Sequence, residues 1–206
     1  MHPNPAFRTA GDHRNLAFAR SRGFGMLAVN AASGPLLSHV PFLLTEDGTA
    51  ADLHLVRSNP IARLLDAATP AVIAVTGPDG YVSPDWYRVD DQVPTWNYVA
   101  VHLRGRLERL PDTDLRRILD EVSDHFETRL APKPVWKTAK MPGDLMAKMM
   151  RTLVPLRLHI ETIEGTWKLN QNKPDAVRLS AADHVAADGL GTDTATLADL
   201  MRAPPA

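Results

Sequence analysis

The close spacing of apolar runs in the first half of the chain constrains the fold most strongly. Residues 24–29, 35–44 and 52–57 are rich in apolar side chains, and the loops that join them, 30–34 and 46–48, contain turn-forming residues. Parallel strands need a crossover connection of a dozen or more residues, and these loops are too short for one. The runs therefore predict antiparallel strands that begin with a β-hairpin.

Further strands and helices follow along the chain. The sequence predicts strands at residues 71–76, 97–107 and 156–163, and helices at 12–22, after Asn59-Pro60, at 111–129, after Gly143 and after Lys173-Pro174. Residues 77–80 follow the strand at 71–76, and an aromatic, proline-marked loop is predicted from 81 to 96. This arrangement is α+β, and it favours a small antiparallel barrel with flanking helices.

Length and composition are those of a globular domain. The chain has 206 residues, of which 44% are hydrophobic and 23% are charged. We expect one domain over residues 1–185 and a tail or short docked helix over 186–206. No apolar stretch approaches the ~20 residues of a membrane-spanning helix, and no signal-peptide pattern is present at the N-terminus. We therefore expect a cytoplasmic protein that does not contact a membrane.

Cysteine usage and charge exclude several classes of site. The absence of cysteine excludes disulfides, cysteine-ligated zinc, iron–sulfur clusters and thiol nucleophiles. No H-E-x-x-H pair is present, so we predict no metal site. The formal net charge of −1 gives the whole protein no attraction to nucleic acid.

The segment 129–157 departs from this average. It carries seven positive charges against one negative charge, from Asp144. A solvated basic face is the preferred interpretation and a DNA contact the weaker one, because no helix-turn-helix pattern accompanies the charges. In its second half an apolar helical face is predicted to pack into the core; this face consists of Leu145, Met146, Met149 and Met150.

The segment HLVRSNP, residues 54–60, carries the strongest local signal for a ligand. It ends a predicted strand with Arg57 and places Ser58 and Asn59 at the start of a helix. Free backbone N–H groups at a helix start and a planar guanidinium both suit a phosphate. An ordinary Asn cap beside a solvent-exposed arginine explains the same residues, and such caps are common.

Three other segments combine polar and aromatic groups. Ser38-His39-Val40-Pro41 interrupts an apolar strand, and the proline indicates a strand edge where the backbone is free to meet a ligand. An edge strand with a satisfied histidine is the alternative. The aromatic residues of 81–98 suit ring stacking, a dimer interface or a lid over the core. Residues 167–172 (WKLNQN) suit recognition of a heterocycle edge or a turn before a helix.

Five segments together resemble the PaiB family of FMN-binding proteins, described as negative transcriptional regulators in spore formers. They are SHVPFLL (38–44), HLVRSNP (54–60), GPDGYVSPDWY (77–87), VPTWNYVAVHLRGRL (93–107) and EGTWKLNQNK (164–173). The resemblance implies an FMN-binding split barrel similar to pyridoxamine-phosphate oxidases and flavin reductases. It also implies a homodimer with FMN at the subunit interface.

The resemblance also implies roles for individual residues. Arg57, Ser58 and Asn59 would hold the FMN phosphate, and His54 would flank the ribityl chain. His39, Val40 and Pro41 would meet the isoalloxazine edge, with Ser38 nearby. The site would be closed, from the same or the partner subunit, by Trp96, Asn97, Tyr98, Lys168 and Gln171. The related oxidases place basic residues along the strand that matches 38–44. This chain departs from that pattern with Ser38 and Leu43, and the departure bears on whether it shares their substrate chemistry.

Three functions are compatible with these implications. The first is a flavin-dependent transcriptional regulator. The second is an FMN-dependent oxidoreductase of the flavin-reductase or pyridoxamine-phosphate-oxidase type, so the question of enzymatic activity stays open. The third is a haem-binding split barrel with His39 or His54 as an axial ligand.

Overall fold

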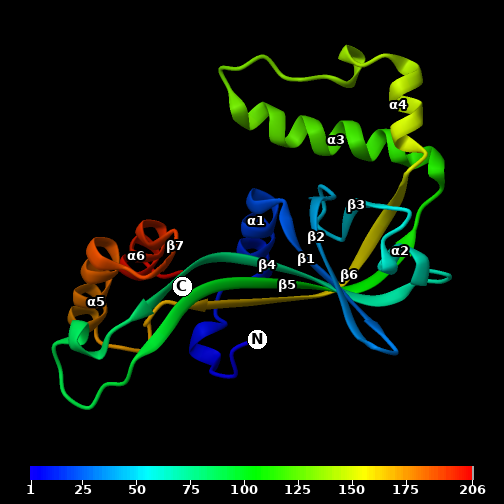
Figure 1. Cartoon of the computed structure of the whole chain (residues 1–206). Coiled ribbons are helices and arrows are strands. Elements are labelled where there is room, and N and C mark those ends of the chain that lie inside the picture. The colour runs from blue at the N-terminus through cyan, green and yellow to red at the C-terminus, as the bar shows by residue number, and fades with distance from the viewer. Residues whose placement is uncertain (206) are drawn as a thin grey trace. The chain divides into compact units, whose positions relative to one another are not determined.

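The computed structural model describes residues 1–205 and is built on an antiparallel sheet of seven strands (Figure 1). The strands are β1(Phe24–Ala31), β2(Gly34–Leu44), β3(Ala50–Val56), β4(Thr69–Val82), β5(Thr95–Arg109), β6(Leu153–Lys168) and β7(Gly191–Thr192). The α-helices are α1(Asp12–Arg22), α2(Pro60–Leu64), α3(Leu115–Glu127), α4(Gly143–Met150), α5(Asp175–Asp188) and α6(Thr194–Arg202). The predicted α+β class and the antiparallel pairing are confirmed.

The chain forms two compact units. Residues 18–75 and 103–163 make up the first, which we call the barrel unit. Residues 1–17, 76–102 and 164–206 make up the second, which we call the terminal unit. The strands β4, β5 and β6 contribute residues to both units. Each of these strands is longer than the sequence predicted.

The barrel unit closes its sheet. The strand order is β1-β2-β3-β6-β5-β4, and β1 also pairs with β4 through Met26↔Ala74 and Val29↔Ala71. Alternate side chains point inward, so Leu27, Phe42 and Leu53 are fully buried. Closure of this kind removes exposed strand edges, as in an antiparallel split barrel.

A close approach of two strands explains one glycine of the barrel. A Cβ atom on Gly105 of β5 would lie 1.8 Å from the backbone oxygen of His159 on β6. No side chain fits at that distance, so the packing of β5 against β6 requires glycine at this position.

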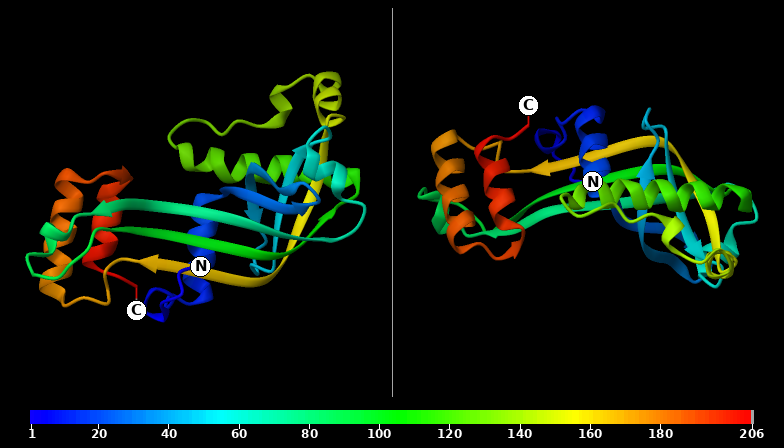
Figure 2. Two further views of the ribbon diagram at one scale, coloured as in Figure 1. Left: turned by 60° about the horizontal axis from the view of Figure 1, so that its bottom comes forward. Right: turned by 90° about the horizontal axis from the view of Figure 1, so that it is seen from above.

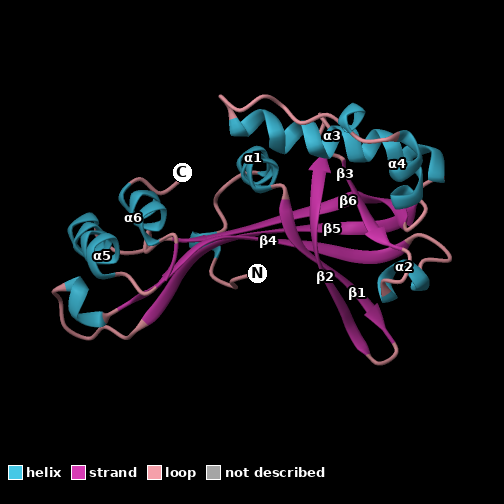
Figure 3. Ribbon diagram, turned by 45° about the horizontal axis from the view of Figure 1, so that its top comes forward, coloured by secondary structure: helices cyan, strands magenta, loops and turns pink. Residues whose placement is uncertain are grey.

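Helix α3 packs against β2 and β3 and covers one outer side of the barrel (Figure 3). Leu115, Ile118 and Val122 form its buried face. This confirms the amphipathic helix predicted at 111–129, although the α-helix itself is shorter than predicted. An ion-pair cluster fixes this face. The buried carboxylate of Asp52 accepts hydrogen bonds from Arg157 Nε and Nη2 at 2.6 and 2.8 Å and from Arg117 Nη1 of α3 at 3.0 Å.

The terminal unit contains the ends of β4, β5 and β6 together with α5 and α6. These two helices lie side by side (Figure 2) and bury Ala181, Val185, Leu197 and Met201. Arg178 of α5 is buried and donates to the backbone oxygens of Met201 and Arg202 at the end of α6. Those carbonyls have no partner within their own helix, so the arginine caps α6.

One strand is longer than predicted, and one local prediction is wrong. The strand predicted at 71–76 continues as β4 to Val82, so the start of the loop predicted at 81–96 is strand. The apolar face of α4 was predicted to enter the core, but only Met146 is buried. Leu145 and Met149 are 44% and 52% exposed.

Within residues 1–205, every helix is too short or too polar to cross a lipid bilayer.

Candidate functional site

The structure brings two of the predicted motifs together in the barrel unit. The side-chain amide of Asn59 donates from Nδ2 to Ser38 Oγ at 2.8 Å. Its Oδ1 accepts from the backbone N–H of Ile61 at 2.9 Å, which is the N-cap of α2. One asparagine therefore caps a helix and joins residues 38–41 to residues 57–59, although 21 residues separate it from Ser38.

Arg57 is held in place beside this contact. Its Nε donates to the backbone oxygen of Arg151 at 2.8 Å, and its Nη2 contacts Asp112 Oδ2 at 2.7 Å. Asp112 also pairs with Arg109 at 3.0 Å. Hydrogen bonds from Arg57 and then from Arg109 hold the pKa of Asp112 below its ordinary value. The three side chains carry two positive charges and one negative charge, so the cluster stays cationic at neutral pH.

The sequence did not reveal Asp112, which lies 55 residues from Arg57. No spacing signal links the two positions, because the contact depends on the turn between β5 and α3 reaching the end of β3. The sequence shows directly that a basic residue ends the strand. The carboxylate that orients this residue is brought to it only by the tertiary fold.

Strand alternation divides the predicted residues of β2 between two faces. Ser38 and Val40 share the inward face with buried Phe42, whereas His39 and Pro41 point outward. The side chain of Val40 is buried, so only its backbone could touch a ligand. Strand β2 pairs with β3 only through residues 42–44. Residues 38–41 of β2 do not pair with β3.

His54 points to the same outer side as His39 and Pro41, because Leu43 lies opposite Asp52 in the register of β2 and β3. Its Nδ1 is buried without a hydrogen-bond partner among the described residues. Burial lowers its pKa below the ordinary histidine value, so His54 is neutral at pH 7. His39 is exposed and stacks on Phe24, with ring centroids 6.3 Å apart.

The remaining predicted residues lie in the terminal unit. Trp96 and Tyr98 share one face of β5 and border a cavity of about 450 Å³. Trp96 is 46% exposed and makes an edge contact with Tyr81, with centroids 6.2 Å apart. Asn97 points to the opposite face, is fully buried, and neither its Oδ1 nor its Nδ2 has a partner in the part of the chain that is described.

Lys168 and Gln171 occupy the end of β6 and the turn after it. Lys168 donates to Thr95 Oγ1. The Gln171 side chain bonds to nearby backbone: its Oε1 accepts from the Leu169 N–H at 2.8 Å, and its Nε2 donates to the Trp167 carbonyl. The segment was predicted as a turn before a helix or as a heterocycle-binding edge. Its first residues are strand, and Gln171 has the hydrogen bonds of a turn residue.

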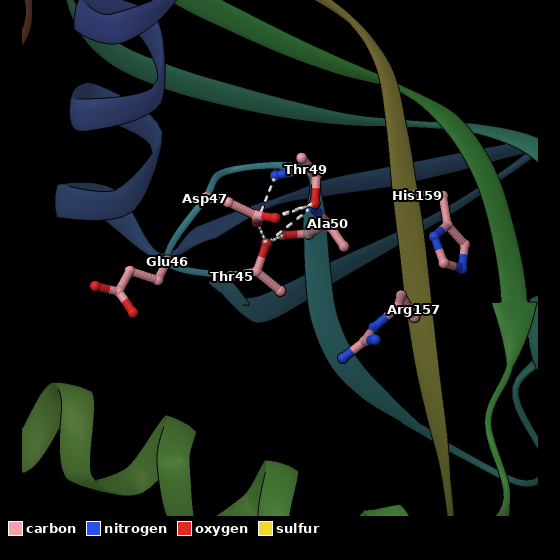
Figure 4. Close-up of a pocket in the computed structure, with 7 residues that line it drawn as sticks. All are labelled: Thr45, Glu46, Asp47, Thr49, Ala50, Arg157 and His159. Carbon is pink, nitrogen blue, oxygen red and sulfur yellow. Dashed lines mark hydrogen bonds between the residues drawn. The ribbon is translucent and has the colours of Figure 1, made fainter.

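A second cavity, of about 620 Å³, lies at the turn between β2 and β3 (Figure 4). Several of its polar groups are already paired. Asp47 accepts from the hydroxyls of Thr45 and Thr49 at 2.7 and 2.9 Å, and Arg157 is bound to Asp52. None of the predicted site residues borders this cavity, so it is a stabilised turn and not the candidate site.

Several known proteins are similar to this chain in sequence or in fold. A sporulation protein of Bacillus subtilis, "Protease synthase and sporulation protein PAI 2", is 27% identical over 170 residues, which cover 82% of this chain and 81% of that protein. The FAD and heme binding protein from Mycobacterium smegmatis has a TM-score of 0.58 at 20% identity, covering 90% of this chain and 82% of that chain. The flavocytochrome Anf3 from Azotobacter vinelandii also has a TM-score of 0.58, at 14% identity, covering 81% and 72%.

At these identities the two solved structures show the fold, and they agree with the closed sheet described above. The family match is more specific. Residues 1–162 match the model of the family described as "Putative FMN-binding domain", and this range includes β1 to β5, α2 and all of residues 38–59. The chain therefore belongs to this family of FMN-binding domains, and FMN is the cofactor that both the family and the sequence indicate.

Proposed function

We propose that the protein holds FMN with its phosphate at Arg57, Ser58 and Asn59 and with its isoalloxazine ring along the outer face of β2. The observation that carries the proposal is the 2.8 Å hydrogen bond from Asn59 to Ser38, because it joins the phosphate-type motif to the strand motif. When bound, FMN supplies one- or two-electron transfer, and the protein contributes binding and orientation.

The charges near Arg57 fit a phosphate. The contacts of Arg57 through Nε and Nη2 leave its Nη1 without a hydrogen-bond partner among residues 1–205, so this N–H₂ group can donate to a phosphate oxygen. Ser58 is exposed and supplies a hydroxyl donor. Helix α2 has only five residues, so we assign the electrostatic attraction to the guanidinium and not to a helix dipole.

The ring portion would meet His39, Pro41 and His54, which point to the same outer side. The buried, unpartnered Nδ1 of His54 fits a ligand group at this position. Trp96 and Tyr98 offer exposed aromatic surface for a planar ring, from the same or a partner subunit. Asn97, Lys168 and Gln171 stay predictions, because their side chains are buried or engaged with neighbours.

A homodimer is part of this proposal. The outer face of β1 and β2 exposes Phe24 and Leu37, at 46% and 55%, beside Met26 and Pro41. Contiguous apolar surface of this kind is typical of a subunit interface. Sedimentation analysis of the purified protein tests this, and a monomer at all concentrations would contradict it.

We further propose a regulatory role in the cytoplasm, in line with the resemblance to the PaiB family. Direct DNA contact has weak support. In the basic segment 129–157, Lys133 pairs with Glu127 and Lys137 with Asp124, so part of its charge is neutralised within the protein. An FMN-dependent oxidoreductase is the alternative, and the outward exposure of His39 beside the proposed ring position favours it.

Titration of the purified full chain with FMN tests the central proposal, with flavin absorbance and fluorescence as readouts. We expect saturable binding of one FMN per chain. Haem titrated under the same conditions separates the two cofactors, and binding of haem without FMN would refute the proposal. Oxidation of NADH or NADPH by the FMN-loaded protein would favour the oxidoreductase over the regulator.

A further inference from the structure

A small cationic pocket in the terminal unit is bordered by Lys168, which was predicted to help close the flavin site, and by Asn170 and Lys173, which have no place in the flavin proposal. It has a volume of about 250 Å³ and lies between the loop after β4, the start of β5 and the turn after β6. Pockets for drug-sized ligands measure roughly 300–1,000 Å³, so this one suits a smaller molecule. We propose that it binds a small oxyanion, the carboxylate or phosphate group of a low-molecular-weight ligand.

Two ammonium groups border the pocket without a carboxylate partner. Lys168 Nζ donates to Thr95 Oγ1. Lys173 Nζ donates to the side-chain oxygen of Gln92 and lies 4.3 Å from the centroid of the Tyr87 ring. No ion pair involves either lysine within residues 1–205. Two cations held by neutral acceptors leave a positive charge that an anion would neutralise.

A buried amide adds a directional donor. Asn170 lines the pocket and is 2% exposed, and its Nδ2 has no hydrogen-bond partner among the described residues. Its Oδ1 accepts a hydrogen bond from the Tyr87 hydroxyl at 3.4 Å. The N–H₂ group of the amide therefore remains available as a donor. An unpaired buried donor destabilises the fold unless a ligand or water accepts from it.

The backbone holds Asn170 in this position. Its φ is +63°, in the left-handed region, which asparagine tolerates better than most residues. The Gln171 side chain bonds to the backbone of Leu169 and Trp167, just before Asn170, and fixes the same turn. The donor is therefore fixed before a ligand arrives, and the pocket needs little reorganisation to bind one.

One carboxylate opposes the anion. Asp91 also borders the pocket, but its side chain is exposed, so water and salt screen its charge. Lys168 and Lys173 are half-buried, and their attraction is screened less. The two lysines and the amide outweigh the one screened carboxylate.

Calorimetric titration of the full chain with sodium phosphate and with sodium succinate tests this inference. We expect saturable heat with at least one anion. The anion that binds more tightly shows whether the pocket prefers a phosphate or a carboxylate group. Lys173→Gln should weaken that binding about 10- to 100-fold, since hydrogen bonds to charged groups contribute this much. Asn170→Gly, which keeps the left-handed backbone, should also weaken it.

Lys148→Gln on α4 is the matched control, because it removes the same charge from an exposed position in the barrel unit. It should leave anion binding unchanged, and Lys173→Gln should leave FMN affinity and the melting temperature without ligand unchanged. Three results would overturn the inference: no saturable heat with either anion, equal losses in the control, or a matching loss of FMN affinity in Lys173→Gln. The last result would assign the pocket to the flavin site.

Discussion

Replacement of Arg57 by alanine probes the proposed phosphate position most sharply. The structure orients this guanidinium through the Arg151 carbonyl at 2.8 Å and Asp112 at 2.7 Å. A hydrogen bond to a charged group contributes about 1.5–3 kcal/mol, so Arg57→Ala should raise the dissociation constant of FMN about 10- to 150-fold. Arg57→Lys keeps the charge but loses the planar fork, and an intermediate loss is expected.

Arg109→Ala is the control for charge alone. Arg109 pairs with the same Asp112 carboxylate but lies outside the proposed phosphate contacts. Its removal should change FMN affinity no more than a few-fold. The side chains of Arg57 and Asp112 are 38% and 54% exposed, and such a pair contributes at most about 1 kcal/mol to stability. Arg57→Ala should therefore fold normally, as circular dichroism and thermal melting will show.

FMN fluorescence titration measures all three variants in one buffer. Unchanged affinity in folded Arg57→Ala would remove this residue from the site. Equal losses in Arg57→Ala and Arg109→Ala would show that general charge, and not a positioned guanidinium, attracts the cofactor.

Three further predictions follow from the packing. Asp52→Asn should lower the free energy of unfolding by about 2–3 kcal/mol in urea titrations, because a buried carboxylate bound to Arg157 is lost but the arginine stays partly hydrated. Burial alone would raise the pKa of Asp52, yet its arginine partners hold this pKa below the ordinary value. The stability that the carboxylate contributes is therefore present above about pH 4 and is lost as the pH falls through the folded-state pKa. The Asp52→Asn variant should lack that acid-dependent loss. Gly105→Ala should fail to give soluble folded protein, since its Cβ would meet the His159 oxygen at 1.8 Å, and a normal melting curve would contradict the close approach. Trp96→Ala should change the melting temperature little but weaken FMN binding, and unchanged binding would exclude this ring from stacking on the flavin.

The antiparallel barrel was predictable because its signals are local. Short loops excluded parallel crossovers, and the alternation of residues 97–107 placed Val99, Val101 and Leu103 on one buried face, as the structure has them. The N-cap of α2 was equally readable, since Asn59 followed by Pro60 is a local signature.

Predictions that depended on distant packing were wrong or incomplete. The strand predicted to end at residue 76 continues to Val82, because the neighbouring strands of the sheet extend beyond their predicted ends as well. Met149 matched the spacing of a core helix, yet 52% of its surface is exposed. The contact of Asn59 with Ser38 was also invisible, because only the closed sheet brings β2 to the start of α2.

A crystal structure of the FMN-loaded protein will show where the cofactor lies. We expect the phosphate within 3.2 Å of the Arg57 guanidinium, a normal hydrogen-bond distance, with the ring against His39 and Pro41. A flavin bound elsewhere, with Arg57 still engaged only by Asp112 and the Arg151 carbonyl, would contradict it.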